Sequence, residues 1–226
     1  MNLLHLDCSV RREASTTRAV TRLYADLWRE TNPGGSYVYR DFAEEPVPHV
    51  DEGTVSAEFV PEADRTEEQR AGAAVSAPYI AELLAADEVL IGVPMYNFSI
   101  PSTLKAWLDR VTLNKYIVPP GATAGPLTGK KVVLALARGG SYRAGAPREA
   151  FDHQLPYLRS AFGQIGLDGD LTFLVCEMTH AFTVPALAQF KPIAEASRTD
   201  AERAVRSLLG VEETDPRTTT APSTAN

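Results

Sequence analysis

Short apolar runs alternate with amphipathic stretches along most of the chain. Most of the runs are rich in Val, Leu and Ile and far too short to span a bilayer, so we expect them to be buried strands. They occupy residues 2–7, 36–42, 87–93, 132–137 and 171–176. Because helical patterns separate them, the fold class is predicted to be α/β, with a doubly wound parallel sheet of five strands in the order 2-1-3-4-5.

The amphipathic stretches carry apolar residues three and four positions apart, a spacing typical of helices that bury one face. One helix is expected to begin near Pro101, because proline suits the first helical turn. The other helices are expected at residues 17–30, 67–86, 148–165 and 186–209.

Two long segments interrupt this alternation. Residues 43–65 contain prolines and many acids without a clear period, which indicates an excursion with one short helical turn, and residues 112–129 form a second long loop. After Gly210 the composition changes to Thr, Pro, Ser and Ala, which predicts a disordered tail over residues 211–226. Residues 1–210 are therefore expected to form a single domain.

Composition and charge narrow the function classes. The formal net charge of −7 argues against binding to nucleic acids or to anionic membranes, because both are polyanions. The first residues lack the features of a signal peptide, and Cys8 and Cys176 provide no disulfide framework. The four histidines have no metal-ligand spacing, so we expect them to be structural and expect no metal. These features predict a cytoplasmic protein.

Doubly wound sheets bind ligands beyond the carboxyl ends of their strands, where the strand order reverses. In the order 2-1-3-4-5 this point lies between the first and third strands. The loops after the first, third and fourth strands therefore form the candidate site, and each has an unusual composition.

The loop after the first strand is rich in hydroxyls and leads into a helix. Its hydroxyl side chains are Ser9, Ser15, Thr16 and Thr17. A helix N-terminus offers free N–H groups and partial positive charge, which suit a phosphate, and Arg11, Arg12 and Arg18 would add charge. Capping of the helix by Ser15 or Thr16 explains the same residues and stays open. No G-x-G-x-x-G motif is present, so the dinucleotide-binding fingerprint is absent.

The loop after the third strand reads Met95-Tyr96-Asn97-Phe98. Backbone amides beside aromatic and thioether faces suit a planar heterocycle. A hydrophobic plug at the sheet edge explains these residues equally well when they are taken alone.

The loop after the fourth strand begins with Arg138-Gly139-Gly140. Two glycines let the backbone approach a ligand closely, and their N–H groups suit a carbonyl or a developing anion. A simple Gly-Gly turn, with Arg138 in a surface ion pair, is the alternative. No nucleophile elbow or acid–base set accompanies these loops, and Cys8 is expected to be a packed strand-end residue. This combination favours a cofactor that brings its own chemistry.

Together these residues resemble a known family. Pro94-Met95-Tyr96-Asn97-Phe98, followed by Ser99-Ile100-Pro101-Ser102-Thr103-Leu104-Lys105, is similar to the signature of the FMN-dependent NADH:quinone oxidoreductases and azoreductases. The resemblance includes the hydroxyl loop, Gly129-Lys130-Lys131 and Arg138-Gly139-Gly140, and it covers roughly residues 2–209. It implies a flavodoxin-like fold.

By this resemblance, the hydroxyl loop binds the phosphate of FMN through Ser9, Ser15, Thr16 and Thr17. The isoalloxazine ring is lined by Met95, Tyr96, Asn97 and Phe98, and its pyrimidine end is approached by Arg138, Gly139 and Gly140. Asn97 and Gly140 are expected to be the catalytic residues, because their N–H groups face the reacting ring system.

The implied activity is two-electron reduction of quinones and azo compounds by ping-pong hydride transfer, with NADH or NADPH as the donor. Family members are homodimers with active sites at the interface. This chain departs from the family at Ala137, where a serine is common, and at Gln164, which stands in place of an aromatic residue over the substrate, so the substrate preference stays open. The alternatives are a tailoring reductase of an aromatic biosynthetic intermediate, a flavodoxin-type electron carrier and a flavin-binding interaction protein.

Overall fold

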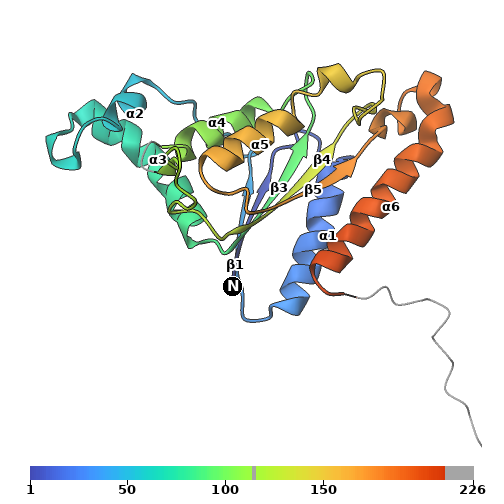
Figure 1. The fold of residues 1–226 in the computed structure, drawn as a ribbon, viewed down its shortest axis with the longest axis horizontal. Helices are drawn as coiled ribbons and strands as arrows, with labels where there is room; N and C mark the ends of the chain where they lie inside the picture. The colour runs from blue at the N-terminus through green and yellow to red at the C-terminus, as the bar shows by residue number, and fades with distance from the viewer. Residues whose placement is uncertain (114–115, 212–226) are drawn as a thin grey trace, which may run out of the picture.

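The computed structural model describes residues 1–113 and 116–211. Within these residues, five parallel strands form one sheet in the order β2-β1-β3-β4-β5, which confirms the predicted topology (Figure 1). The bounds of the strands lie within one residue of the predicted runs, because the central strands are buried on both faces. The strands are β1 (Asn2–Asp7), β2 (Ser36–Asp41), β3 (Glu88–Pro94), β4 (Lys131–Ala137) and β5 (Asp170–Cys176).

Helices cover both faces of the sheet (Figure 1). One face packs against α3 (Glu67–Ala85), α4 (Ser102–Val111) and α5 (Leu155–Gln164), and the other against α1 (Thr16–Thr31) and α6 (Lys191–Leu208). Each layer buries large side chains of the kind that the helical spacing identifies. Among the described residues, every helix is too short or too polar to traverse a bilayer.

The helix predicted over residues 148–165 begins late, at Leu155. The residues before it form a turn that includes the 3-10 helix η3 (Glu149–Phe151). The Asp152 side chain accepts hydrogen bonds from the N–H groups of Gln154 and Leu155 at 3.0 and 3.1 Å. This carboxylate satisfies the first free N–H groups of α5 and so sets the start of the helix.

The helix predicted over residues 186–209 begins at Lys191 instead. Pro192 fits only a first helical turn, so the residues before it form the separate 3-10 helix η5 (Pro185–Phe190). The tail predicted to be disordered, residues 211–226, lies outside the described residues except for its first position.

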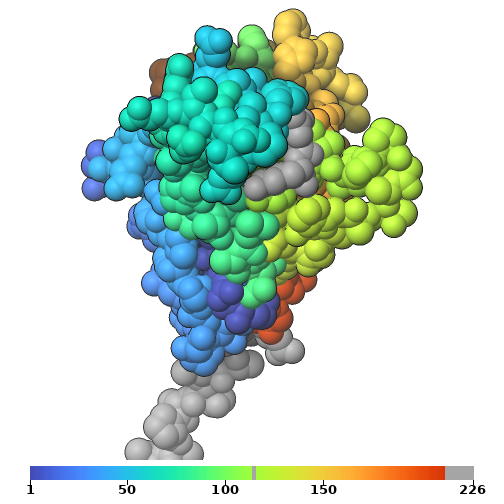
Figure 2. All heavy atoms as spheres, turned by 90° about the vertical axis from the view of Figure 1, so that its left-hand side faces the viewer, coloured from blue at the N-terminus to red at the C-terminus, as the bar shows by residue number. Residues whose placement is uncertain are grey.

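The excursion over residues 43–65 contains two helical turns rather than one. These are α2 (Glu52–Ala57) and the 3-10 helix η1 (Glu62–Asp64), and they project with α3 on the face shown in Figure 2. The backbones of α2 and α3 touch, since a Cβ on Gly72 would lie 2.5 Å from the Thr54 nitrogen. The excursion is therefore packed on α3 rather than free.

Candidate functional site

The loops that follow the strands meet beyond the carboxyl end of the sheet, and those after β3, β4 and β5 are visible beyond the arrowheads in Figure 1. The Tyr96 hydroxyl accepts a hydrogen bond from the Val10 N–H at 3.1 Å, which joins the loops after β1 and β3. The Met95 N–H donates to the Ala137 carbonyl at 2.8 Å, which joins the loop after β3 to the end of β4. The structure therefore brings together the three loops that the sequence indicates.

The hydroxyl loop, residues 9–17, leads into the N-terminus of α1. The Ser15 side chain accepts the Arg18 N–H at 3.3 Å, so Ser15 caps the helix. The Ser15 and Thr17 hydroxyls lie 3.1 Å apart. Capping uses only part of the helix end, because the N–H groups of Thr16 and Thr17 have no acceptor within the described chain. A phosphate can therefore bind beside a capped helix, and the two interpretations are compatible.

Arg18 supports the hydroxyl loop and does not face a ligand. Its buried guanidinium donates to the carbonyls of Ser9 and Arg11 at 2.7 and 3.0 Å and to both carboxylate oxygens of Asp41 at 2.7 and 2.6 Å. Burial raises the pKa of Asp41, but the hydrogen bonds from Arg18 and the nearby backbone outweigh it and the pKa is lowered. Asp41 neutralises Arg18, and Glu44 pairs with Arg12 at 2.6 Å. The expectation that all three arginines add charge is therefore wrong.

Asn97 and Phe98 form a tight turn in an unusual conformation. Their φ angles are 45° and 70°, in the left-handed region that residues other than glycine rarely adopt. Tyr96 and Ser99 close the turn through two backbone hydrogen bonds of 2.9 and 3.0 Å. A bulky residue in this region costs about 1–2 kcal/mol, and such strain is concentrated at ligand sites.

This turn is exposed, so it does not act as a plug. Phe98 is 39% exposed, and its ring centroid lies 5.4 Å from that of Phe151 and 6.4 Å from that of Tyr142. Asn97 is exposed as well, and its N–H has no acceptor in the part of the chain that is described. The turn offers an aromatic surface and a free N–H group side by side.

The backbone of Arg138, Gly139 and Gly140 is fixed on one side and open on the other. The carbonyls of these three residues accept hydrogen bonds from the N–H groups of residues 178–180 at 3.0 to 3.2 Å. The N–H groups of Gly139, Gly140 and Ser141 have no acceptor among residues 1–113 and 116–211. Three consecutive free N–H groups suit a carbonyl or an anion, as predicted for this loop.

The Arg138 side chain points into the protein. It is 3% exposed, lies 3.0 Å from Asp152 and 3.7 Å from Glu177 in ion pairs, and donates from Nε to Gln154 at 3.1 Å. The interpretation of Arg138 as a surface ion pair is therefore wrong, because the network is buried. The Arg138 N–H donates to the Cys176 carbonyl at 2.9 Å, so the donors that this loop leaves open are those of Gly139, Gly140 and Ser141.

His180, in the 3-10 helix η4 (Thr179–Phe182), lies directly on Gly139. A Cβ on Gly139 would come within 2.4 Å of the His180 ring, whereas a Cβ on Gly140 would meet nothing closer than Tyr142 at 3.6 Å. Gly139 is therefore required for this contact. The sequence predicts only a structural role for His180. The signal that could have placed it in the candidate site is its position just after β5, at the carboxyl edge of the sheet.

A cavity of about 590 Å³ lies between the Asn97–Phe98 turn, the loop after β4 and the segment after β5. Met95, Gly139 and Gly140 also line it. The cavity also includes residues that the sequence did not indicate for the site, among them Ser141, Tyr142, Arg143, Arg148, Met178 and His180. The hydroxyl loop, Tyr96 and Arg138 lie outside its lining, and so does Gln164, which ends α5.

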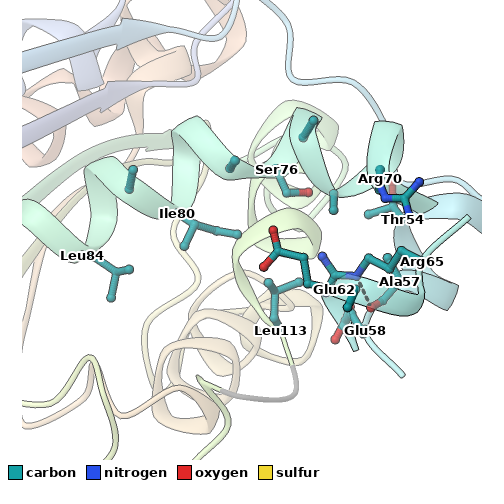
Figure 3. Close-up of a pocket in the computed structure, with 15 residues that line it drawn as sticks. Thr54, Ala57, Glu58, Glu62, Arg65, Arg70, Ser76, Ile80, Leu84 and Leu113 are labelled. Atoms are coloured by element: carbon teal, nitrogen blue, oxygen red, sulfur yellow. Dashed lines mark hydrogen bonds between the residues drawn. The ribbon is translucent and has the colours of Figure 1, made fainter. Parts of the chain in front are cut away.

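A larger groove, of about 1010 Å³, lies between α3 and the α2–η1 excursion. Figure 3 shows Ile80 and Leu84 toward one end and Arg65 and Arg70 toward the other, with Glu62 and Leu113 between them. The strained turn and the free N–H groups are found at the smaller cavity. We therefore assign the chemistry to the smaller cavity and not to the groove.

The fold and these loops define the class of α/β proteins with a doubly wound parallel sheet, in which ligands bind at the carboxyl edge where the strand order reverses, here between β1 and β3. Comparison with known proteins agrees with this class. Residues 1–198 match the family described as having a flavodoxin-like fold, and the chain belongs to that family.

The relatives support the resemblance found in the sequence. The chain is 44% identical to the FMN-dependent NADH:quinone oxidoreductase of Parafrankia sp. (strain EAN1pec), over 91% of this chain and 97% of the relative. It is 42% identical to the protein of the same name from Nocardia farcinica (strain IFM 10152), over 91% of this chain and 96% of the relative.

Solved structures have the same fold. The azoreductase AzrA matches with a TM-score of 0.78 at 23% identity, over 92% of this chain and 99% of the other. The FMN-dependent NADH-azoreductase from Bacillus anthracis str. Ames Ancestor, in complex with FMN, matches with a TM-score of 0.76 at 19% identity, over 92% of this chain and 100% of the other. At these identities the likeness bears on the fold alone.

Proposed function

We propose that this protein is an FMN-dependent NADH oxidoreductase that reduces quinones and azo compounds in a ping-pong reaction. The observation that carries the proposal is the meeting of a helix N-terminus, a strained aromatic turn and three free N–H groups at one edge of the sheet. The names of relatives that are more than 40% identical give the donor and the class of acceptor. Because NADH is the donor, we place the reaction in the cytoplasm.

The residues present fit FMN. We assign the phosphate to the N-terminus of α1, with Ser9, Ser15, Thr16 and Thr17 around it. The ring system is assigned to Met95, Tyr96, Asn97 and Phe98 and to the turn of Arg138, Gly139 and Gly140, in which the two glycines provide the free N–H groups. When bound, FMN supplies the redox chemistry by taking two electrons from the donor and passing them to the acceptor.

The protein's part in this reaction is electrostatic and steric. The N–H groups of Gly139 and Gly140 are assigned to stabilise negative charge at the pyrimidine end, and the Asn97 N–H to contact the reacting edge. Residues 178–180 fix the opposite side of the loop, so these donors need little reorganisation when charge develops. Protons can come from water, so no side-chain acid is required.

Absorbance measurements test this function directly. The purified protein is loaded with FMN, freed of excess flavin and titrated with NADH under nitrogen. Bleaching of a bound flavin followed by recovery on addition of a quinone is expected. Loss of the flavin during gel filtration, or a bound flavin that NADH leaves oxidised, would count against the proposal, and the second result would favour an electron carrier. Steady-state kinetics should give parallel double-reciprocal lines, and intersecting lines would exclude the ping-pong order.

We also propose that the protein acts as a homodimer whose interface includes the α2–α3 groove. Leu84, which lines the groove, is 42% exposed. Val55 in α2 and Phe59 just after it are 48% and 74% exposed, and large apolar side chains exposed in this way are typical of interfaces. Sedimentation equilibrium should give a dimer mass, and Phe59→Asp combined with Leu84→Asp should shift it toward the monomer. A monomeric wild-type protein at micromolar concentration would contradict this proposal.

A further inference from the structure

The candidate cavity is lined by cationic side chains although the protein is acidic. The formal net charge is −7, yet none of the described residues that line the cavity is Asp or Glu. Arg143 and Arg148 both line it. The charged side chains that line this opening are therefore all cationic, opposite in sign to the charge of the molecule, and clefts lined by charge of one sign attract ligands of the other.

Neither guanidinium is neutralised within the described chain. Among residues 1–113 and 116–211, no ion pair involves Arg143 or Arg148, whereas Arg18 pairs with Asp41 at 2.6 Å and Arg138 with Asp152 at 3.0 Å. Arg143 and Arg148 are also exposed, so they remain hydrated until a ligand arrives. An isolated surface arginine is common, but two unpaired ones on the wall of an acid-free cavity form a distinct arrangement.

The loop that carries the two arginines is fixed by bonds that do not use their side chains. Glu177 accepts hydrogen bonds from the Ser141 hydroxyl at 2.6 Å and from the Tyr142 N–H at 2.8 Å. Further along, Glu149 accepts the Gly145 N–H at 2.7 Å. The nearby carboxylates are thus engaged with the loop itself, and the guanidinium groups stay available at the cavity.

We propose that Arg143 and Arg148 form an anion subsite that binds the phosphates of the reduced nicotinamide dinucleotide. This inference rests on the proposed function. A nicotinamide ring that enters the cavity has its pyrophosphate attached through a ribose, so the phosphates must lie toward the opening. Guanidinium groups bind phosphate oxygens through paired charge-assisted hydrogen bonds, and they offset the repulsion between an anionic donor and an acidic protein.

The same chemistry would also bind a sulfonate or carboxylate on an aromatic acceptor. The two sources can be separated, because each half of a ping-pong reaction is measured alone. The donor acts on the oxidised FMN-loaded protein, and the acceptor acts on the reduced protein after the oxidised dinucleotide has been removed.

The test compares the double variant Arg143→Gln/Arg148→Gln with wild type and with Arg22→Gln. Arg22 is an exposed arginine of α1 that does not line the cavity, so its removal changes the net charge alone. The second-order rate constant for reduction by NADH, measured by stopped flow, should fall about tenfold in the double variant. Electrostatic steering of this kind raises association rates by a factor of about 10 to 1000. The rate should also lose most of its dependence on salt. Reoxidation by an uncharged quinone should not change.

Equilibrium binding provides a readout independent of turnover. The non-reducing analogue tetrahydro-NADH, titrated by calorimetry into the FMN-loaded protein, should bind about tenfold more weakly to the double variant than to Arg22→Gln. A slower reaction only with a sulfonated quinone overturns the dinucleotide assignment in favour of an anionic acceptor. Unchanged NADH kinetics in a double variant that retains FMN overturns the subsite alone. Failure of NADH to reduce the wild-type flavin overturns the proposed function itself.

Discussion

The Tyr96 hydroxyl accepts the Val10 N–H at 3.1 Å, across 86 positions of sequence. This hydrogen bond joins the hydroxyl loop after β1 to the strained turn after β3. The two loops are assigned to opposite parts of one ligand, so their relative position decides whether both parts can bind at once. A contact that holds them in place before binding reduces the ordering cost of binding.

Tyr96→Phe is therefore expected to weaken FMN binding about fivefold to tenfold, which corresponds to about 1 kcal/mol for one partly exposed hydrogen bond. The unfolding free energy of the apoprotein should change by less than about 1 kcal/mol. Fluorescence titration of free FMN gives the affinity. Tyr157→Phe, which removes a hydroxyl on α5 away from the site, is the control and should bind FMN like wild type. Equal affinities for all three proteins would show that the loops are aligned without this bond.

Phe98→Gly should separate stability from binding. Glycine adopts a φ of 70° without strain, and Phe98 is 39% exposed, so the variant should be as stable as wild type or up to about 1 kcal/mol more stable. The same change removes the aromatic surface beside the cavity and should weaken flavin binding. Phe98→Ala, which removes the ring but keeps the strain, should be less stable than Phe98→Gly. Urea unfolding and FMN titration measure the two effects, and a large loss of stability in Phe98→Gly would contradict this account of the turn.

Gly139 and Gly140 should respond differently to alanine. In Gly139→Ala the new Cβ would lie 2.4 Å from the His180 ring, so the ring or the loop must move, and we expect a loss of about 1–3 kcal/mol in stability. In Gly140→Ala the nearest atom lies 3.6 Å away, an ordinary contact, so stability should be preserved. Weaker FMN binding by a stable Gly140→Ala protein would then report on the ligand side of the loop. Equal destabilisation of the two variants would show that the His180 contact is not the cause.

Much of the fold could be predicted from the sequence because periodicity reports burial directly. The buried strands β1, β3 and β4 appear as apolar runs, and the strand order follows from the alternation of strands and helices. The starts of α5 and α6 could not be predicted in this way. They depend on a single side chain, the Asp152 carboxylate, and on Pro192, and neither changes the apolar pattern.

The candidate site was predictable only in part, because motifs mark loops but not the direction of side chains. The sequence indicates Arg18 as added charge for a phosphate and Arg138 as part of a ligand turn or a surface ion pair. Each is instead turned inward by partners far away in sequence, Asp41 and Glu177 among them. His180 belongs to no motif, and its contact with Gly139 depends on the packing of the β5 segment on the β4 loop. Long-range pairing of polar groups leaves no periodic signal in one sequence.

Both cysteines should be unreactive in the folded protein. Cys8 and Cys176 are buried, and burial raises the pKa of Cys8 well above its usual value and the pKa of Cys176 to about 11. A thiol reagent such as iodoacetamide should modify neither at pH 8 in buffer and both in urea, as counted by intact mass. Rapid labelling of Cys8 in the native protein would contradict this expectation and indicate a reactive thiol next to the hydroxyl loop.

Asp41→Asn should show how much the pair between Asp41 and Arg18 contributes to the free energy of unfolding, because this contribution depends on pH. The pKa of Asp41 is lowered in the folded protein because the hydrogen bonds from Arg18 outweigh the opposing effect of burial. Its contribution to stability is therefore complete above the unfolded pKa of about 3.9 and is lost as the pH falls through the lower folded value. At pH 7 the variant should lose about 2–3 kcal/mol, the cost of removing a charge-assisted pair.

Urea unfolding of the apoprotein between pH 7 and pH 3 measures this effect. The difference between wild type and Asp41→Asn should stay constant down to about pH 4 and then shrink, because wild type itself loses the carboxylate. Asp26→Asn, which breaks an exposed pair with Arg29 on α1, is the matched control and should cost less than about 1 kcal/mol at every pH. A difference for Asp41→Asn that is as large at pH 3 as at pH 7 would mean that the loss comes from packing, and that the Arg18 charge needs no carboxylate to support the hydroxyl loop.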